Sequence, residues 1–181
     1  MHKNTILSTL FFIIFAFFAV ACSSTKTQES TGQYIDDTVI TTKVKSALLA
    51  DTGLSVYDIN VKTYKGTVLL SGFVDSQKLA DQAAADTRQV TGVRMVKNNL
   101  LINKSAGSVK GYSHDTTITT KVKAAIVGDS HLSAFDINVK TYDAVVQLSG
   151  FVDSQQSAQR AVNLAHKVEG VRKVVNSMEI K

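Results

Sequence analysis

The stretch Leu70-Ser71-Gly72-Phe73-Val74-Asp75-Ser76-Gln77 occurs a second time, unchanged, at Leu148–Gln155. Working outward from it, residues 37–102 align without a gap on residues 115–180, and more than half of the aligned positions are identical. Two copies are too few to stack into a solenoid, so the pattern indicates a duplicated small domain. The question is whether the octapeptide is an active site or a joint that the fold needs twice.

Each copy begins with a predicted helix and continues into a hairpin. Thr38 or Thr116 is placed to cap the helix, and its apolar residues follow helical spacing: Ile40, Val44, Ala47 and Leu48, repeated as Ile118, Val122, Ala125 and Ile126. Residues 59–64 then alternate between apolar and polar, which predicts a half-buried strand. Lys65-Gly66 predicts a two-residue turn, with glycine supplying positive φ. Asp143-Ala144 replaces it in the second copy, where alanine predicts another turn type.

The rest of the copy predicts a strand, a helix and a last strand. The return strand covers residues 67–74, and the helix turns Ala80, Ala83, Ala84 and Val90 inward and has Gly92 as its C′ residue. Residues 93–102 alternate again. The order α-β-β-α-β predicts an α+β fold, with a three-stranded sheet and two helices on one face. A unit this small buries little surface, so we expect the copies to pack on each other or to have well-filled small cores.

Within this scheme the octapeptide joins a strand to a helix. Leu70 faces the core by alternation, and Gly72 marks a bulge or a close backbone approach. Asp75 and Ser76 offer capping oxygens to the next helix. No residue of the octapeptide has a reacting partner in the sequence, which favours a structural joint.

The first residues predict an export signal that is removed. Lys3 precedes a dense apolar run over residues 6–18, and Ala19-Val20-Ala21-Cys22 ends it. Cys22 is the only cysteine, and the segment around it resembles a lipobox, at which bacterial lipoproteins are cleaved and acylated. The predicted organisation is a signal peptide at 1–21 and a flexible spacer at 22–35 after acylated Cys22. The alternative is an uncleaved membrane helix with an incidental cysteine.

Composition and motifs indicate a protein without catalytic chemistry or a cofactor. The net charge of +5 is spread along the chain, without the basic run of a nucleic-acid arm. The four histidines have no partner at a metal-ligand spacing, and no nucleophile elbow or phosphate loop is present in the sequence. We therefore predict no enzyme activity, no metal, no cofactor and no nucleic-acid partner.

Several motifs resemble the BON domain of bacterial envelope proteins. They are the α-β-β-α-β order, the hairpin at residues 66–72, and Val90-Thr91-Gly92-Val93 with its repeat Val168-Glu169-Gly170-Val171. The resemblance implies BON domains at 36–103 and 114–181, joined by a linker at 104–113. It also implies a non-enzymatic protein that binds phospholipid surfaces or supports envelope integrity under osmotic stress.

In the lipid-binding part of this family, the first helix of the second domain contacts the membrane. The corresponding residues here are Thr117, Ile118, Lys121 and Lys123. Lysines near an anionic bilayer contribute about 1 kcal/mol each. The alternative is that Ile118 lies in the core and both lysines belong to an ordinary solvated surface. The sequence does not decide the role of Tyr64 and Tyr142. They are either an interfacial anchor or partner contact, or a cover for the helices.

The expected location is the periplasm, anchored to the outer membrane by the N-terminal lipid, with a soluble periplasmic protein as the alternative. The leading hypothesis is a lipoprotein whose partner is an anionic phospholipid surface. Its rival is a chaperone or adapter for outer-membrane proteins or their assembly machinery. A third possibility is a structural module that docks on peptidoglycan.

Overall fold

The computed structural model describes residues 31–50, 59–103 and 109–181, which form two units with the same order of elements. The first contains α2 (Thr31–Ala50), β1 (Ile59–Tyr64), β2 (Thr67–Val74), α3 (Gln77–Gln89) and β3 (Met95–Ile102). The second contains α4 (Val109–Val127), β4 (Ile137–Tyr142), β5 (Val145–Val152), α5 (Gln155–His166) and β6 (Lys173–Ile180). The predicted α-β-β-α-β order is confirmed in both copies.

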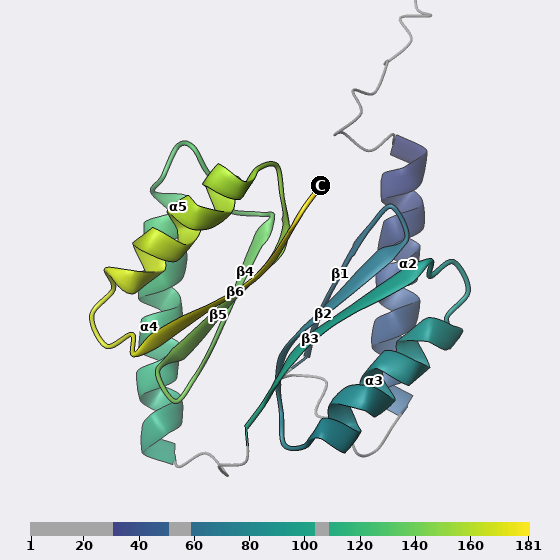
Figure 1. Cartoon of the computed structure of the whole chain (residues 1–181), viewed down its shortest axis with the longest axis horizontal. Helices are drawn as coiled ribbons and strands as arrows, with labels where there is room; N and C mark the ends of the chain where they lie inside the picture. The colour runs from purple at the N-terminus through teal and green to yellow at the C-terminus, as the bar shows by residue number, and fades with distance from the viewer. Residues whose placement is uncertain (1–30, 51–58, 104–108) are drawn as a thin grey trace, which may run out of the picture.

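Each unit has one mixed sheet whose middle strand contains the start of the octapeptide. β2 pairs antiparallel with β1 and parallel with β3, and β5 pairs in the same way with β4 and β6. An antiparallel pair needs only a short turn, whereas a parallel pair needs a crossover, which α3 and α5 supply. The helices of each unit cover one face of its sheet (Figure 1), so the predicted α+β fold is confirmed.

The apolar faces predicted for the helices and strands form the two cores. In the first unit the core consists of Ile40, Val44, Leu48, Ile59, Val61, Val68, Leu70, Val74, Ala80, Ala83 and Ala84. The second core repeats this pattern with Ile118, Val122, Ile126, Ile137, Val139, Val146, Leu148, Val152, Ala158, Ala161 and Ala165. Alanines on α3 and α5 allow these helices to lie close to the sheet, so each small unit still fills its core.

The octapeptide is the predicted joint between a strand and a helix. Gly72 and Gly150 have φ of 123° and 134° near the ends of β2 and β5. The Ser76 hydroxyl then accepts a hydrogen bond from the Leu79 N–H at 3.3 Å, and Ser154 caps α5 in the same way. The cap is therefore the serine and not the preceding aspartate.

The first helix of each unit begins earlier than predicted. Thr38 and Thr116, expected as caps, lie inside α2 and α4, which begin at Thr31 and Val109. The Thr38 hydroxyl donates to the Tyr34 carbonyl at 2.9 Å, a bond that satisfies a threonine within a helix. Residues 31–35 of the predicted spacer and 109–113 of the predicted linker are therefore helical.

The end of α3 also differs from its prediction. The helix ends at Gln89 with Val90 as its cap, so Gly92 is not the C′ residue. Gly92, at φ 99°, belongs to a turn in which the Val93 N–H donates to the Val90 carbonyl at 3.1 Å. Because Val93 belongs to this turn, β3 begins at Met95, two residues later than predicted.

Both hairpins have the same type of turn, so the expectation of a different turn in the second copy is wrong. Lys65 and Gly66 have φ of 48° and 74°, and Asp143 and Ala144 have φ of 48° and 59°. Positive φ at both central residues defines type I′, whose twist matches that of the strands. Alanine therefore occupies a left-handed position that favours glycine.

A carboxylate from the first helix holds each turn. Asp37 is 5% exposed and accepts hydrogen bonds from the backbone N–H groups of Lys65 and Gly66 at 2.5 and 2.8 Å. Asp115 accepts the corresponding bonds from Asp143 and Ala144 at 2.7 and 2.8 Å. These bonds fix the turn backbone, which explains how Ala144 is held in the same conformation as Gly66.

Ala144→Gly should stabilise the protein by about 0.5–1 kcal/mol, because glycine adopts positive φ without the steric cost that alanine has. The reverse change, Gly66→Ala, should destabilise it by about 1 kcal/mol, since a Cβ there would lie 2.5 Å from Cδ of Arg94. Urea unfolding of the two variants measures both effects. A lower midpoint for Ala144→Gly would contradict this explanation.

The two sheets pack against each other on the faces that the helices leave open (Figure 1). Tyr64 stacks on Phe151 with ring centroids 5.4 Å apart, and Tyr142 stacks on Phe73 at 5.6 Å. Ser71 and Ser149, the same position of the two octapeptides, share a hydrogen bond of 2.8 Å. Exchanging the two copies therefore maps the first ring contact onto the second, and the serine pair onto itself. The expected packing of the copies on each other is confirmed, and both tyrosines contact the other copy rather than covering the helices.

One buried amide lies at the centre of this contact. Gln147 is 1% exposed, and its Oε1 accepts from the Gly72 N–H at 2.6 Å. Its Nε2 donates to the Asn99 carbonyl at 2.6 Å and to the Ser177 hydroxyl at 2.9 Å. The first copy has Leu69 at the corresponding position. Gln147 therefore joins the two sheets with hydrogen bonds that Leu69, its counterpart in the first copy, cannot form.

Gln147→Ala should destabilise the protein by about 2–3 kcal/mol, because it leaves buried donors and acceptors of both sheets without partners. Gln159→Ala is the matched control, since Gln159 is exposed on α5 and its side chain, among the described residues, bonds to Asn163; its effect should stay within about 0.5 kcal/mol. Urea unfolding compares the two. Equal effects would show that the Gln147 bonds do not hold the sheets together.

Candidate functional site

The structure separates the four residues predicted to contact a membrane in the second copy. Ile118 is 0% exposed and belongs to the core, which was the alternative for this residue. Lys121 Nζ lies 3.7 Å from a carboxylate oxygen of Glu169. Thr117 and Lys123 are exposed on α4. The four residues therefore do not share one outward surface. Cys22, predicted to be the lipid attachment site, lies outside the described residues.

The matching part of the first copy has a different surface. Val39 and Lys43 of α2 line a shallow hollow of about 380 Å³ together with the β1–β2 turn and Arg94. Ile35 and Val39 are 56% and 46% exposed. Residues four apart on a helix lie on one side, so Ile35, Val39 and Lys43 form a single stripe. We call Ile35, Val39, Lys43, Lys65 and Arg94 the first-copy surface.

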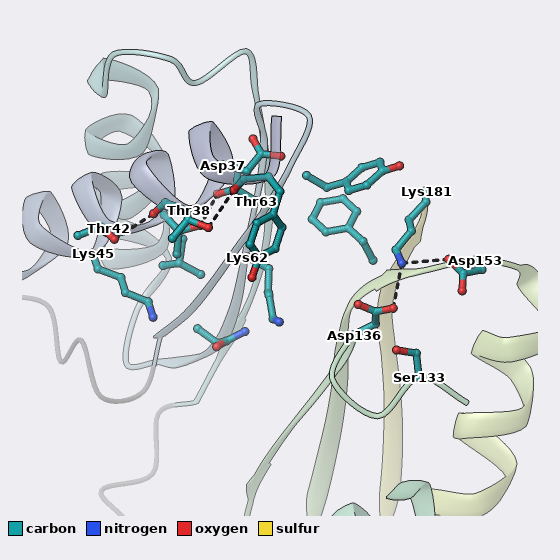
Figure 2. A pocket seen from close by; sticks show the side chains of 16 residues that line it. Asp37, Thr38, Thr42, Lys45, Lys62, Thr63, Ser133, Asp136, Asp153 and Lys181 are labelled. Atoms are coloured by element: carbon teal, nitrogen blue, oxygen red, sulfur yellow. Dashed lines mark hydrogen bonds and ion pairs between the residues drawn. The ribbon is translucent and has the colours of Figure 1, made fainter. Parts of the chain in front are cut away.

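A larger cleft of about 1150 Å³ lies between the two copies (Figure 2). One wall is the side of α2 that presents Thr38, Thr42 and Lys45, followed by residues 60–64 of β1. The opposite wall comes from the second copy and contains Ser133, Asp136, Phe151, Asp153 and Lys181. Because β1 is an edge strand, its unpaired edge borders this cleft.

Lys181 forms two ion pairs in the cleft wall. Its Nζ lies 2.9 Å from Asp136 and 3.0 Å from Asp153 (Figure 2). Burial lowers the pKa of Lys181, but the two carboxylates outweigh it and raise the pKa above its usual value. The lysine therefore stays charged and ties the C-terminal strand to the loops before β4 and after β5. Its pairing leaves little attraction for an anionic ligand.

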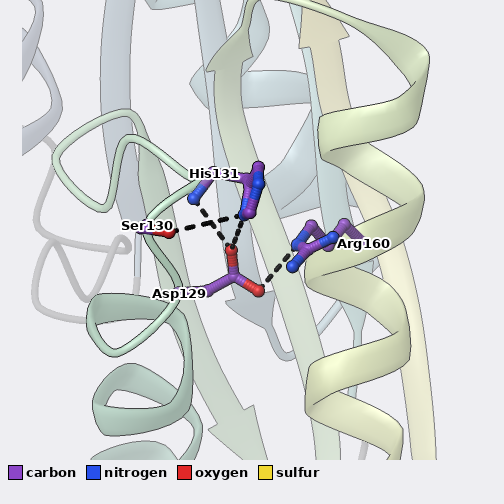
Figure 3. A network of polar contacts seen from close by, with 4 residues as sticks. All are labelled: Asp129, Ser130, His131 and Arg160. Atoms are coloured by element: carbon purple, nitrogen blue, oxygen red, sulfur yellow. Dashed lines mark hydrogen bonds and ion pairs between the residues drawn. The ribbon is translucent and has the colours of Figure 1, made fainter.

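The loop after α4 contains the other polar network (Figure 3). Asp129 accepts hydrogen bonds from Arg160 Nε at 2.6 Å and from the His131 backbone N–H at 2.9 Å. The Arg160 bond is the largest cause of a pKa of Asp129 below its usual value, and the His131 bond adds to it. The network fastens this loop to α5, and it includes no group facing a cavity.

Asp129 should stabilise the protein at neutral pH and lose this effect in acid. Its folded pKa is lowered, so the stabilisation is present above the unfolded pKa near 3.8 and disappears as the pH falls through the folded pKa. Asp129→Asn should therefore unfold at lower urea than the wild type at neutral pH. The two midpoints should converge in acid. A difference that stays constant with pH would contradict the assignment.

The described residues contain no catalytic or metal-binding constellation. Among them, no group of three or more His, Cys, Asp or Glu side chains could hold a metal ion. Neither hollow is lined by a His, a Cys or a Glu in the part of the chain that the structure describes. The helices given by the structure include none that is long and apolar enough to span a bilayer.

Two α-β-β-α-β units in tandem define an α+β repeat protein, and comparison with known proteins identifies its family. The BON domain model matches residues 36–104 and 114–181, so the chain belongs to the BON-domain family. It is 42% identical over 151 residues to osmotically-inducible protein Y of Escherichia coli, covering 83% of this chain and 75% of that protein. It is also 34% identical over 158 residues to outer membrane lipoprotein DolP of Haemophilus influenzae, covering 87% and 81%.

A third relative is the 21 kDa hemolysin of Actinobacillus pleuropneumoniae, 31% identical over 147 residues that cover 81% of this chain and 75% of that protein. The BON family, predicted from the order of elements, the hairpin at residues 66–72 and the repeated Val-x-Gly-Val motif, is thus confirmed. Sequence reasoning did not single out Ile35, Lys43, Lys65 or Arg94. A signal was present, because Val39 and Lys65 are among the positions where the copies differ.

Proposed function

We propose that this chain is a periplasm-facing lipoprotein that maintains the outer membrane under osmotic or envelope stress by binding phospholipid surfaces, without catalysis. The observation that supports this most directly is Cys22 at the end of the apolar segment, in a chain similar to an outer membrane lipoprotein over most of its length. The similarity to an osmotically-inducible protein supports the stress role. A lipid anchor would hold both BON domains at the bilayer surface.

Labelling cells with a clickable palmitate analogue tests the anchor. The wild type should be labelled and fractionate with the outer membrane, whereas Cys22→Ala should be unlabelled and leave the membrane fraction. Label on Cys22→Ala, or an unlabelled wild type, would contradict the anchor. A strain lacking the protein should lose envelope integrity at high osmolarity, and wild-type growth and permeability there would contradict the stress role.

A chaperone for unfolded outer-membrane proteins is the second candidate. The observation that favours it is the unpaired edge of β1 beside the cleft between the copies. An extended peptide can add to an open edge by backbone hydrogen bonds. Suppression of the aggregation of an unfolded outer-membrane protein, unaffected by added phospholipid vesicles, would support this function over lipid binding.

A further inference from the structure

We propose that the surface that faces the lipid is the first-copy surface, and that it binds the head groups of anionic phospholipids. This inference rests on the proposed function at a membrane, and it names the part of the molecule that contacts the bilayer. It places the contact on α2 and the β1–β2 turn of the first copy. The matching part of the second copy then does not contact the lipid.

Cations outnumber carboxylates in the hollow beside α2. The hollow beside α2 is lined by three cations, Lys43, Lys65 and Arg94, and by the carboxylates of Asp36 and Asp37. Asp37 is buried and accepts hydrogen bonds from the turn. Within the described residues, neither Lys43 nor Arg94 forms an ion pair. These two cations are exposed and available to phosphate groups.

In the second copy, acidic side chains lie beside the same positions. Lys121, which matches Lys43, pairs with Glu169 at 3.7 Å, and Arg172, which matches Arg94, pairs with Asp143 at 2.8 Å. Both acids are specific to the second copy, where they replace Thr91 and Lys65. Two cations there face three carboxylates, including Asp115, whereas three cations face two carboxylates in the first copy. An anionic surface therefore favours the first copy.

An exposed apolar stripe lies next to these cations. Ile35 and Val39 lie on the side of α2 that continues to Lys43, and more than two-fifths of each side chain is exposed. An apolar stripe bordered by cations suits the boundary between head groups and acyl chains. In the sequence of the second copy, Ser113 and Thr117 replace these two residues. The apolar contact is thus also confined to the first copy.

The predicted anchor at Cys22 is close in sequence to the start of α2. Residues 23–30 separate Cys22 from the start of α2 at Thr31. Even fully extended, this segment spans only about 30 Å. Lys43 lies about 18 Å along the helix from Thr31, at 1.5 Å per residue. An acylated Cys22 would therefore hold this end of α2 close to the bilayer.

Vesicle binding by the mature chain with Cys22→Ser tests this surface. The vesicles contain phosphatidylglycerol in phosphatidylethanolamine, with phosphatidylcholine vesicles as the neutral control. Lys43→Ser with Arg94→Ser should weaken binding to the anionic vesicles at least about tenfold. The matched pair Lys121→Ser with Arg172→Ser should leave it within about twofold, because the carboxylates of Glu169 and Asp143 beside those cations repel an anionic surface. Ile35→Ser with Val39→Thr, which installs the residues of the second copy, should weaken it as well.

All six substituted residues are exposed, with Ile35 and Val39 on the outer side of α2. Unchanged circular dichroism spectra and urea midpoints confirm that each variant is folded. If the double variant of Lys121 and Arg172 weakens binding as much as the double variant of Lys43 and Arg94, the proposed location of the lipid-binding surface is wrong. Lipid binding by the protein would still be supported. If the wild type fails to bind anionic vesicles, both this surface and the lipid part of the proposed function are refuted. Equal binding to neutral vesicles would overturn the role of the cations.

Discussion

Gly150→Ala should destabilise the second copy by about 3 kcal/mol or more, the largest effect expected of a single methyl group in this chain. A Cβ at this position would lie 1.8 Å from the Asp136 carbonyl oxygen and 3.0 Å from its carbon. The φ of 134° is also one that side chains rarely adopt. Both neighbours are backbone atoms, so relief requires a shift of the β4–β5 pairing itself.

Gly32→Ala is the matched control for this change. Gly32 lies in α2, and nothing is within 4 Å of the position that its Cβ would take. Alanine within a helix favours folding over glycine by about 0.5–1 kcal/mol. Urea unfolding should thus give opposite signs for the two variants. A Gly150→Ala protein with the wild-type midpoint would refute the close approach of the two strands.

Asp37→Ala should cost about 2–4 kcal/mol, because it removes both acceptors of the β1–β2 turn and leaves two turn N–H groups without protein partners. Asp37→Asn retains one carbonyl acceptor and should cost roughly half as much. Asp115→Ala should cost less than Asp37→Ala, since Asp115 is more exposed and water can replace its bonds. Thermal or urea unfolding ranks the three variants. A smaller loss for Asp37→Ala than for Asp115→Ala would contradict this account of the turn.

The elements of the fold could be predicted because their signals are local. Apolar residues at helical spacing gave the buried side of α2, and alternation separated the two faces of β1, since each periodicity depends on only one element. The repeated octapeptide then required the second copy to have the same order. Helix ends were harder to predict. The Thr38 hydroxyl can cap a helix or bond within one, and the choice depends on the residues before it.

The open face of each sheet could not be assigned in this way. Alternation places Tyr64 and Phe73 opposite the core but does not say what covers them. The answer is the other copy, through pairs of rings that are far apart in the sequence. The turn at Ala144 was mispredicted for a related reason. Its φ depends on Asp115, a residue of another element that holds the turn backbone in place.

The candidate site was predicted by resemblance to the second domain of relatives, and the ion pairs explain why the first copy is favoured here. Lys121 and Lys43 look equivalent in the sequence. They differ because Glu169, in the turn between α5 and β6, comes within 3.7 Å of Lys121. A pairing across so many residues follows from the tertiary fold, so only the structure identifies which lysine has a carboxylate beside it.

Hydrogen–deuterium exchange of the mature chain, with and without vesicles containing phosphatidylglycerol, tests most directly the central claim that the first copy docks on the membrane. Exchange should slow on the vesicles in peptides covering residues 33–43 and 64–67. It should stay unchanged in the matching peptides at residues 111–121 and 142–145. Slower exchange confined to the second copy, or no change in either copy, would contradict the claim.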